Sequence, residues 1–194
     1  MKRWLLALFA SLSLVSTATP AAIIHFEVDL LGSNENPPNA SPATGNAKID
    51  LDTLTRFLTI DLTFSGLLGL TTASHIHCCA ATPTMNAPVA TQVPSFVGFP
   101  LGVTSGSYLH TFDMNLSSSY NPSFVTAHGG TVDSAYADLL AGLLGGQAYL
   151  NIHTTQFPGG EIRGTLIQVP EPATLALLGI ALAGLGTLRR RSAR

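Results

Sequence analysis

The chain has 194 residues, of which 46% are hydrophobic and 10% charged, and its formal net charge is −2 at pH 7. Residues 23–168 contain three basic and ten acidic residues, a net charge of −7, so the overall balance comes from the two ends of the chain. An acidic domain argues against nucleic acid as a partner, because nucleic-acid binding needs a basic patch.

The first 22 residues have the layout of a secretory signal peptide. Lys2 and Arg3 precede an apolar run, residues 5–15, and small residues follow it. The run is shorter than the roughly 20 residues that span a membrane, which favours a cleaved signal. Cleavage could follow Ala18 or Ala22. The sequence therefore predicts an exported protein.

Residues 23–168 are predicted to form one all-β domain, an antiparallel sandwich or barrel. Apolar and polar residues alternate with a period of two, which is typical of half-buried strands. The alternating segments are residues 24–30, 46–51, 58–64, 148–153 and 161–166. One helix is expected at residues 132–144, with Thr131 or Asp133 as its N-cap. The stretch 82–100 is rich in Pro and Ala and is expected to be a long loop.

Polar residues two apart in the sequence suggest a patch on one face of the predicted sheet. Because alternate residues of a strand share a face, His75 and His77 are expected to point the same way. If their strands are neighbours, these residues form one polar patch: His75, His77, Asn151, His153, Glu161 and Arg163. Within it, Glu161 and Arg163 are expected to form an ion pair.

The three histidines of this patch have two interpretations. His75, His77 and His153 could ligate Zn or Cu, because imidazole suits both metals. Alternatively they form a structural network, hydrogen bonded to the backbone, Asn151 and Glu161 across the strands. The other histidines, His25, His110 and His128, have no partner pattern and are expected to be ordinary surface or hydrogen-bonded residues.

Cys78 and Cys79 are the only cysteines. An exported domain favours disulfides. We therefore expect a vicinal disulfide in preference to two free thiols or to thiolate ligands beside His77.

The C-terminal segment, residues 169–194, resembles the bacterial PEP-CTERM sorting signal. Pro170-Glu171-Pro172 precedes an uncharged apolar stretch, residues 173–188, and then a cluster of arginines. The stretch is near the lower length limit for a membrane-spanning helix, and the arginines would stay on the cytoplasmic side. The resemblance implies a Gram-negative bacterium, an exosortase that recognises the motif and cuts near it, and transient or permanent anchoring in the cell envelope.

The segment between the two ends resembles the chordin-type (CHRD) domain. The matching pieces, in order, are residues 31–38, 43–47, 75–77, 149–154 and 160–164. The resemblance implies an immunoglobulin-like β-sandwich, similar to that of copper/zinc superoxide dismutase. It implies no established biochemical activity.

The sequence contains no Gly-x-Ser-x-Gly, P-loop, dinucleotide fingerprint or His-Glu-x-x-His motif. No catalytic residue is therefore expected. The leading hypothesis is a non-enzymatic, envelope-associated protein that binds an unknown surface or matrix partner. The alternative is a metal-binding or superoxide-dismutase-like metalloprotein that uses the histidine patch.

Overall fold

The computed structural model describes residues 23–82 and 84–169. They form eight strands, two α-helices and two short 3₁₀ turns. In chain order these are β1 (Ile23–Leu31), η1 (Gly32–Asn34), β2 (Thr44–Asp52), β3 (Phe57–Ser65), β4 (Thr71–His77), β5 (Gly106–Asp113), η2 (Ser117–Ser119), α1 (Pro122–Ala127), α2 (Val132–Leu144), β6 (Tyr149–Thr154), β7 (Ile162–Thr165) and β8 (Ile167–Val169).

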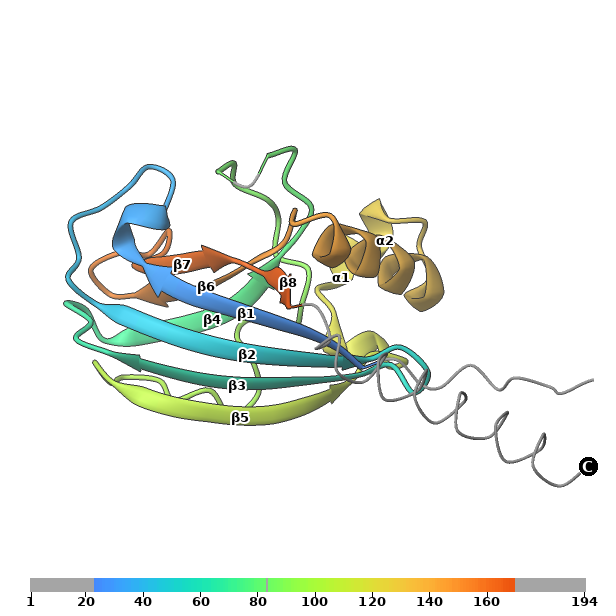
Figure 1. The fold of residues 1–194 in the computed structure, drawn as a ribbon, viewed down its shortest axis with the longest axis horizontal. Helices are drawn as coiled ribbons and strands as arrows, with labels where there is room; N and C mark the ends of the chain where they lie inside the picture. Colours follow the sequence, from blue (N-terminus) through green and yellow to red (C-terminus); the bar gives the residue numbers. More distant parts are fainter. Residues whose placement is uncertain (1–22, 83, 170–194) are drawn as a thin grey trace, which may run out of the picture.

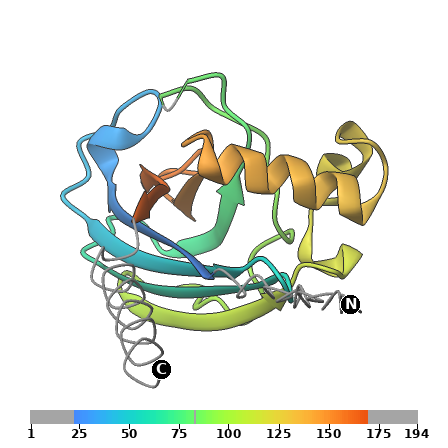
Figure 2. The same cartoon turned by 45° about the vertical axis from the view of Figure 1, so that its right-hand side comes forward.

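All eight strands belong to one antiparallel sheet with the order β4-β6-β7-β1-β2-β3-β5. Strand β8 lies outside this order and pairs with the first half of β1. The sheet curls into a half-barrel, and α2 lies across its open side (Figures 1 and 2).

The inner face of the curl holds the hydrophobic core. Alternate residues of β1, β2 and β3 are buried, including Phe26, Ile49 and Ile60, while the residues between them face water. From α2, Leu139 and Leu143 join the same core. The period-two pattern thus places one face of each strand inside, as expected for a sheet that is wet on its other side.

The predicted antiparallel β-fold is confirmed, with two corrections. The strands form one continuous curled sheet rather than two sheets stacked in a sandwich. The described residues also hold two α-helices rather than one. Helix α1 was missed because its six residues are too few to show a helical period.

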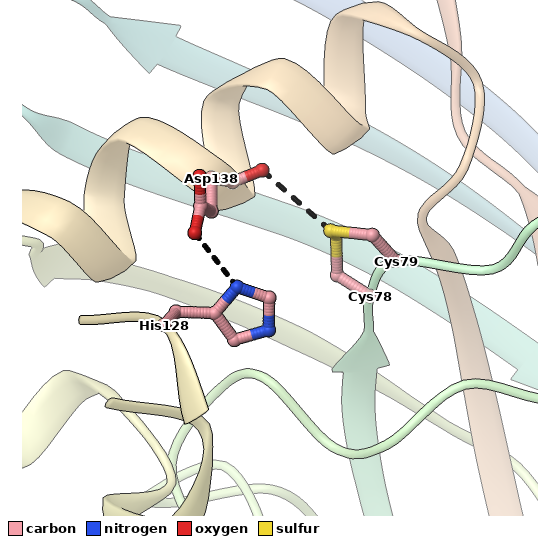
Figure 3. Close-up of a disulfide and its surroundings, with 4 residues drawn as sticks. All are labelled: Cys78, Cys79, His128 and Asp138. Carbon is pink, nitrogen blue, oxygen red and sulfur yellow. Dashed lines mark hydrogen bonds and ion pairs between the residues drawn. A yellow bond between two sulfur atoms is a disulfide. The ribbon is translucent and has the colours of Figure 1, made fainter. Parts of the chain in front are cut away.

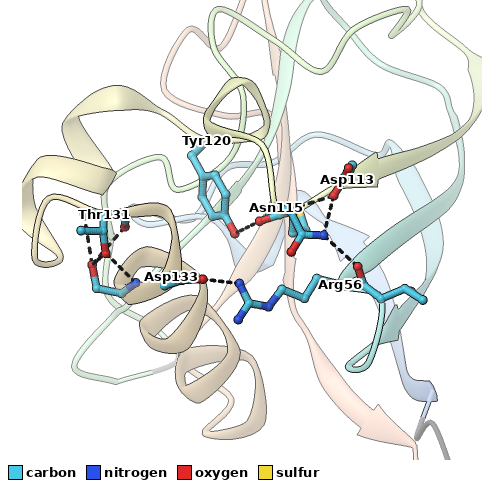
Figure 4. A network of polar contacts seen from close by, with 9 residues as sticks. Arg56, Asp113, Asn115, Tyr120, Thr131 and Asp133 are labelled. Atoms are coloured by element: carbon cyan, nitrogen blue, oxygen red, sulfur yellow. Dashed lines mark hydrogen bonds and ion pairs between the residues drawn. The ribbon is translucent and has the colours of Figure 1, made fainter.

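The helix predicted at residues 132–144 is confirmed with the same bounds, and Thr131 is its N-cap. The Thr131 and Ser134 side chains each bond to the other's backbone, which satisfies exposed N–H groups of the first turn. Asp133 in this turn pairs with Arg56, and Arg56 lies 4.5 Å from the ring centre of Tyr136. Figure 4 shows Thr131 at the start of α2 and the Arg56–Asp133 pair, which fastens α2 to the β2–β3 turn.

The described part of the chain begins and ends at the same side of the sheet, because His25 of β1 pairs with Val169 of β8. The predicted signal peptide (residues 1–22), the Pro170-Glu171-Pro172 motif and the predicted hydrophobic helix (residues 173–188) lie outside the described residues. Neither described helix is long and apolar enough to cross a membrane.

Candidate functional site: a three-histidine cluster

The strands that carry the predicted polar patch are neighbours in the sheet. β6 lies between β4 and β7, and the register aligns His75, Asn151 and Arg163 in one row across the three strands. His153 is paired with Ala73, two positions from His75. The condition on which the predicted patch depended is therefore met.

This face is not an open surface, however. His75 and His77 are only 6% and 8% exposed, and Asn151 and Arg163 are more deeply buried. The segment between β4 and β5, residues 78–82 and 84–105, folds over the patch and is called the covering loop. Its Pro94, Ala87, Asn86 and Thr84 all bond to patch side chains. The patch is thus a polar layer between the sheet and a loop.

His75, His77 and His153, here called the three-histidine cluster, form a compact triangle. The centres of their rings are 5.2–5.9 Å apart. One nitrogen of each ring contacts a backbone carbonyl: His75 Nε2 with Pro94 O at 2.7 Å, His77 Nδ1 with Ala87 O at 2.8 Å, and His153 Nδ1 with Pro158 O at 2.9 Å. A carbonyl only accepts, so these three nitrogens carry the hydrogen.

The opposite nitrogens, His75 Nδ1, His77 Nε2 and His153 Nε2, are then lone-pair acceptors. All three are buried and have no hydrogen-bond partner among the described residues. They lie within 4.8 Å of one another. In a tetrahedral Zn²⁺ site with Zn–N distances of about 2.0–2.1 Å, neighbouring nitrogens lie about 3.3–3.4 Å apart, so the three rings would move together by about 1 Å to ligate one ion.

A ring that donates its far N–H to a carbonyl has a fixed tautomer and orientation, which is the usual support for a metal-ligating histidine. By contrast, a buried acceptor left without any partner costs about 1–3 kcal/mol. The donor set and its supporting bonds therefore fit a transition-metal ion. The three carbonyl bonds, and an Asn151 side-chain interaction that raises the pKa of His77, also fit the structural network. The three nitrogens without a hydrogen-bond partner among the described residues are what favours the metal interpretation.

Asn151 and Tyr149 complete the surroundings of His77. Asn151 Oδ1 is a fourth buried acceptor without a hydrogen-bond partner in the described chain. It lies on the same face of β6 as His153 and could provide an oxygen ligand. The Tyr149 ring stacks on the His77 ring at 4.7 Å, and its hydroxyl bonds to Ala87 O, the same carbonyl that His77 contacts.

Arg163 joins the covering loop to the η1 turn. Its guanidinium donates to Asn34 O, Asn86 Oδ1 and Thr84 O at 2.6–2.9 Å and lies over the Tyr149 ring. Its carboxylate partner is Glu35, with Nε and Oε2 3.9 Å apart. Arg163 therefore holds in place the loop whose carbonyls orient His75 and His77.

The predicted ion pair between Glu161 and Arg163 is wrong. Glu161 is fully buried and accepts hydrogen bonds from Ser41 Oγ, Leu68 N, Gly69 N and Thr154 Oγ1. Glu161 precedes the first residue of β7, and these partners turn it away from the row that contains Arg163. Burial raises the pKa of Glu161, but these hydrogen bonds outweigh it and lower the pKa overall.

The structure joins Cys78 and Cys79 in a vicinal disulfide directly after His77. Cys78 is fully buried, and both sulfur atoms pack against Gly142 of α2. Figure 3 shows the disulfide beneath α2, where Cys79 Sγ contacts Asp138 O. The disulfide thus fixes the end of β4 against a helix, with its sulfur atoms on the side of the strand opposite His77.

The remaining histidines have local partners. His25 Nδ1 bonds to Asp50, and His128 Nδ1 bonds to Asp138 beside the disulfide (Figure 3). His110 contacts the Phe112 ring edge-on, with ring centres 4.6 Å apart. The described residues contain one group of three metal-ligating side chains, the three-histidine cluster.

Burial controls the protonation of this polar layer. It lowers the pKa of His75 and of His77 to about 4, with a partly opposing effect from the carbonyl bonds, and it also lowers the pKa of His153. Burial raises the pKa of Glu35 to about 7 against the opposing charge of Arg163. At neutral pH the three rings are therefore neutral and able to donate lone pairs to a metal.

These shifts predict the pH dependence of the metal-free protein. The unfolded chain protonates histidine near pH 6.5, so the stability that neutral His75 and His77 contribute is present above pH 6.5 and lost as the pH falls toward 4. Glu35 acts in the opposite sense, because its raised pKa favours the folded state as the pH falls from 7 to 4.5. Urea unfolding in EDTA should show a net loss of stability on acidification, and a steeper loss in Glu35→Gln. An identical slope in the variant would contradict the prediction for Glu35.

Two matches to protein-family models identify the sequence family. Residues 26–166 match the model of the CHRD domain, which covers more than half of the chain. Residues 168–191 match the PEP-CTERM protein-sorting motif. No curated protein and no solved structure matches the chain.

The sorting motif implies that the protein is exported, processed by an exosortase and sorted to the cell surface. The two matches agree with the resemblances in the sequence, and the CHRD match contains all three histidines of the cluster. The chain therefore belongs to the CHRD domain family and carries a PEP-CTERM sorting motif at its C-terminus.

Proposed function

We propose that this protein is a non-enzymatic, surface-sorted domain that binds a transition-metal ion, Zn or Cu, through His75, His77 and His153. One observation carries the proposal: three buried imidazole nitrogens without hydrogen-bond partners converge within 4.8 Å, while the opposite nitrogen of each ring is held by a carbonyl. Neutral imidazoles suit both metals.

Binding rather than turnover is supported by the cover over the cluster. A catalytic metal keeps a coordination position that substrate can reach. Here His75 and His77 are almost inaccessible beneath the covering loop. Arg163 holds that loop in place by donating hydrogen bonds to Asn86 Oδ1 and Thr84 O. We therefore favour a held ion, which stabilises the exported domain, over a superoxide-dismutase-like metalloenzyme.

The test is elemental analysis of the full chain, exported by its own signals and purified without a histidine tag. After incubation with Zn²⁺ or Cu²⁺ and removal of free metal, we expect about one ion per chain. The His75→Ala/His77→Ala double variant should retain at least tenfold less. The matched control is His110→Ala/His128→Ala, which removes two histidines outside the cluster and should keep the ion. Equal retention in both variants, or no ion in the wild type, would refute the site.

Thermal unfolding provides a second readout that does not require equal stability of the variants. A ligand at 100 times its Kd stabilises the folded state by about 2.7 kcal/mol, so Zn²⁺ should raise the Tm of the wild type. The same addition should leave the Tm of His153→Ala unchanged, and a similar rise in both proteins would argue against the cluster as the site.

A further inference from the structure

The two outermost strands of the sheet, β4 and β5, have different free edges. The covering loop bonds to the free edge of β4 along its length. Ala90 N donates to Ile76 O, Phe96 N to Ser74 O, and Gly102 N to Thr71 O, at 2.9–3.2 Å. Because its backbone groups are already bonded, this edge cannot accept another strand.

The free edge of β5 has no such cover within the described residues. Beyond the end of β5, Met114 N donates to Arg56 O at 2.9 Å, so the even-numbered residues of the strand direct their backbone groups toward β3. The N–H and C=O groups of Ser107, Leu109 and Thr111 therefore point away from the sheet. In Figure 1, β5 forms the lower border of the sheet.

β5 also lacks the features that usually prevent an edge strand from pairing with another chain. Residues 106–113 contain no proline and no lysine, and the pairing with β3 runs from Gly106 to Asp113 without a register shift. Leu109, at the centre of the strand, is 71% exposed. A long, regular edge of this kind, whose one carboxylate is at its last residue, is a template for pairing with another strand.

We propose that β5 pairs with β5 of a second copy of this chain, antiparallel about a two-fold axis at Leu109. In this register Leu109 faces Leu109 of the second copy, and Ser107 faces Thr111 on each side. The outward backbone groups of these residues then form three hydrogen-bonded pairs, or about six hydrogen bonds. The same surface is used on both copies, as a closed dimer requires.

Charge favours a second copy in this register, although the domain is acidic overall. Residues 106–112 carry no Asp, Glu, Lys or Arg, and Asp113 would face Ser105 of the second copy. Asp61, the neighbour of Leu109 in β3, would lie three strand spacings from its equivalent, roughly 14 Å away. This distance exceeds the screening length of about 8 Å at physiological ionic strength.

Cysteine cross-linking in the full exported chain tests this pairing. In the proposed register the two Cα atoms at position 109 lie about 5.5 Å apart, within the range of roughly 4.4–6.8 Å for a disulfide. We expect Leu109→Cys to give a reductant-sensitive band at twice the chain mass. The control, Leu54→Cys, lies in the β2–β3 turn, is 73% exposed and should give no reductant-sensitive band at twice the chain mass. Equal dimer in both variants, no dimer, or a product with a different protein would overturn the proposal.

A second pair of variants tests the pairing without a covalent bond. Leu109→Lys would place two ammonium groups opposite each other, and sedimentation should show a dimer dissociation constant at least tenfold higher than that of Leu54→Lys. Leu109 is exposed, so its Tm should match that of the control. A dimer that is equally strong in both lysine variants would exclude β5 as the interface.

Discussion

Arg163→Met is expected to lower the free energy of unfolding by about 3–5 kcal/mol at pH 8, as loss of one partner of a buried ion pair usually does. Arg163 is only 2% exposed, and its guanidinium holds the η1 turn and two residues of the covering loop. The variant would leave Glu35 buried without its positive partner. It would also free the loop that orients His77.

The pH dependence separates the ion pair from the hydrogen bonds. The pKa of Glu35 is raised to about 7, so at pH 5 this residue is mostly neutral before any substitution. The cost of Arg163→Met should therefore be smaller at pH 5 than at pH 8. Urea unfolding at the two pH values measures this difference in cost. In a Glu35→Gln background, Arg163→Met should cost the same at pH 5 and at pH 8. A cost that is the same at both pH values would mean that the hydrogen bonds alone account for the role of Arg163.

Gly142→Ala is expected to destabilise the protein by about 1–3 kcal/mol, the usual cost of overpacking a core. In an ordinary helix the same substitution stabilises by about 1 kcal/mol. Here an added Cβ would lie 2.6 Å from Cys79 Sγ and closer still to Cys78 Sγ. Because α2 and the end of β4 are both packed in the core, neither can move away without cost.

A double-mutant cycle tests the cause of this effect. In a Cys78→Ala/Cys79→Ala background both sulfur atoms are gone, so Gly142→Ala should return to its ordinary stabilising effect. Free energies of unfolding of the four proteins give the coupling directly. If Gly142→Ala destabilises both backgrounds equally, the sulfur atoms are not what requires glycine at this position.

The sequence predicted the elements that have a clear period. The alternation in β1, β2, β3 and β6 is visible because one face of each strand packs in the core. Helix α2 was predicted to its last residue, because Thr131 caps it and Gly145 follows it. Strand β5 was not predicted, although Tyr108 and Phe112 point inward from it, since polar and apolar residues are mixed on its outer face.

The path of the covering loop and its contacts with the sheet could not be predicted from the sequence. The loop has no period, and its bonds to the sheet come largely from backbone N–H and C=O groups, which nearly every residue possesses. The three histidines could therefore be named as a group, but not their burial or the direction of each ring. The partner of Arg163 was also missed, because Glu35 lies 128 positions away in the sequence and only the fold brings it near.

The pairing of β8 with β1 has a mechanical consequence for a protein in which Pro170-Glu171-Pro172 of the sorting motif directly follows Val169. A pull on the chain beyond this residue acts first on β8, whose three residues are exposed and pair with His25, Phe26 and Glu27. The next residue inward, Leu166, is fully buried, and its N–H donates to Ala148 O. Tension would peel away β8 and then meet the buried core at Leu166. Under tension β8 can therefore separate from β1 first, while the three-histidine cluster stays intact.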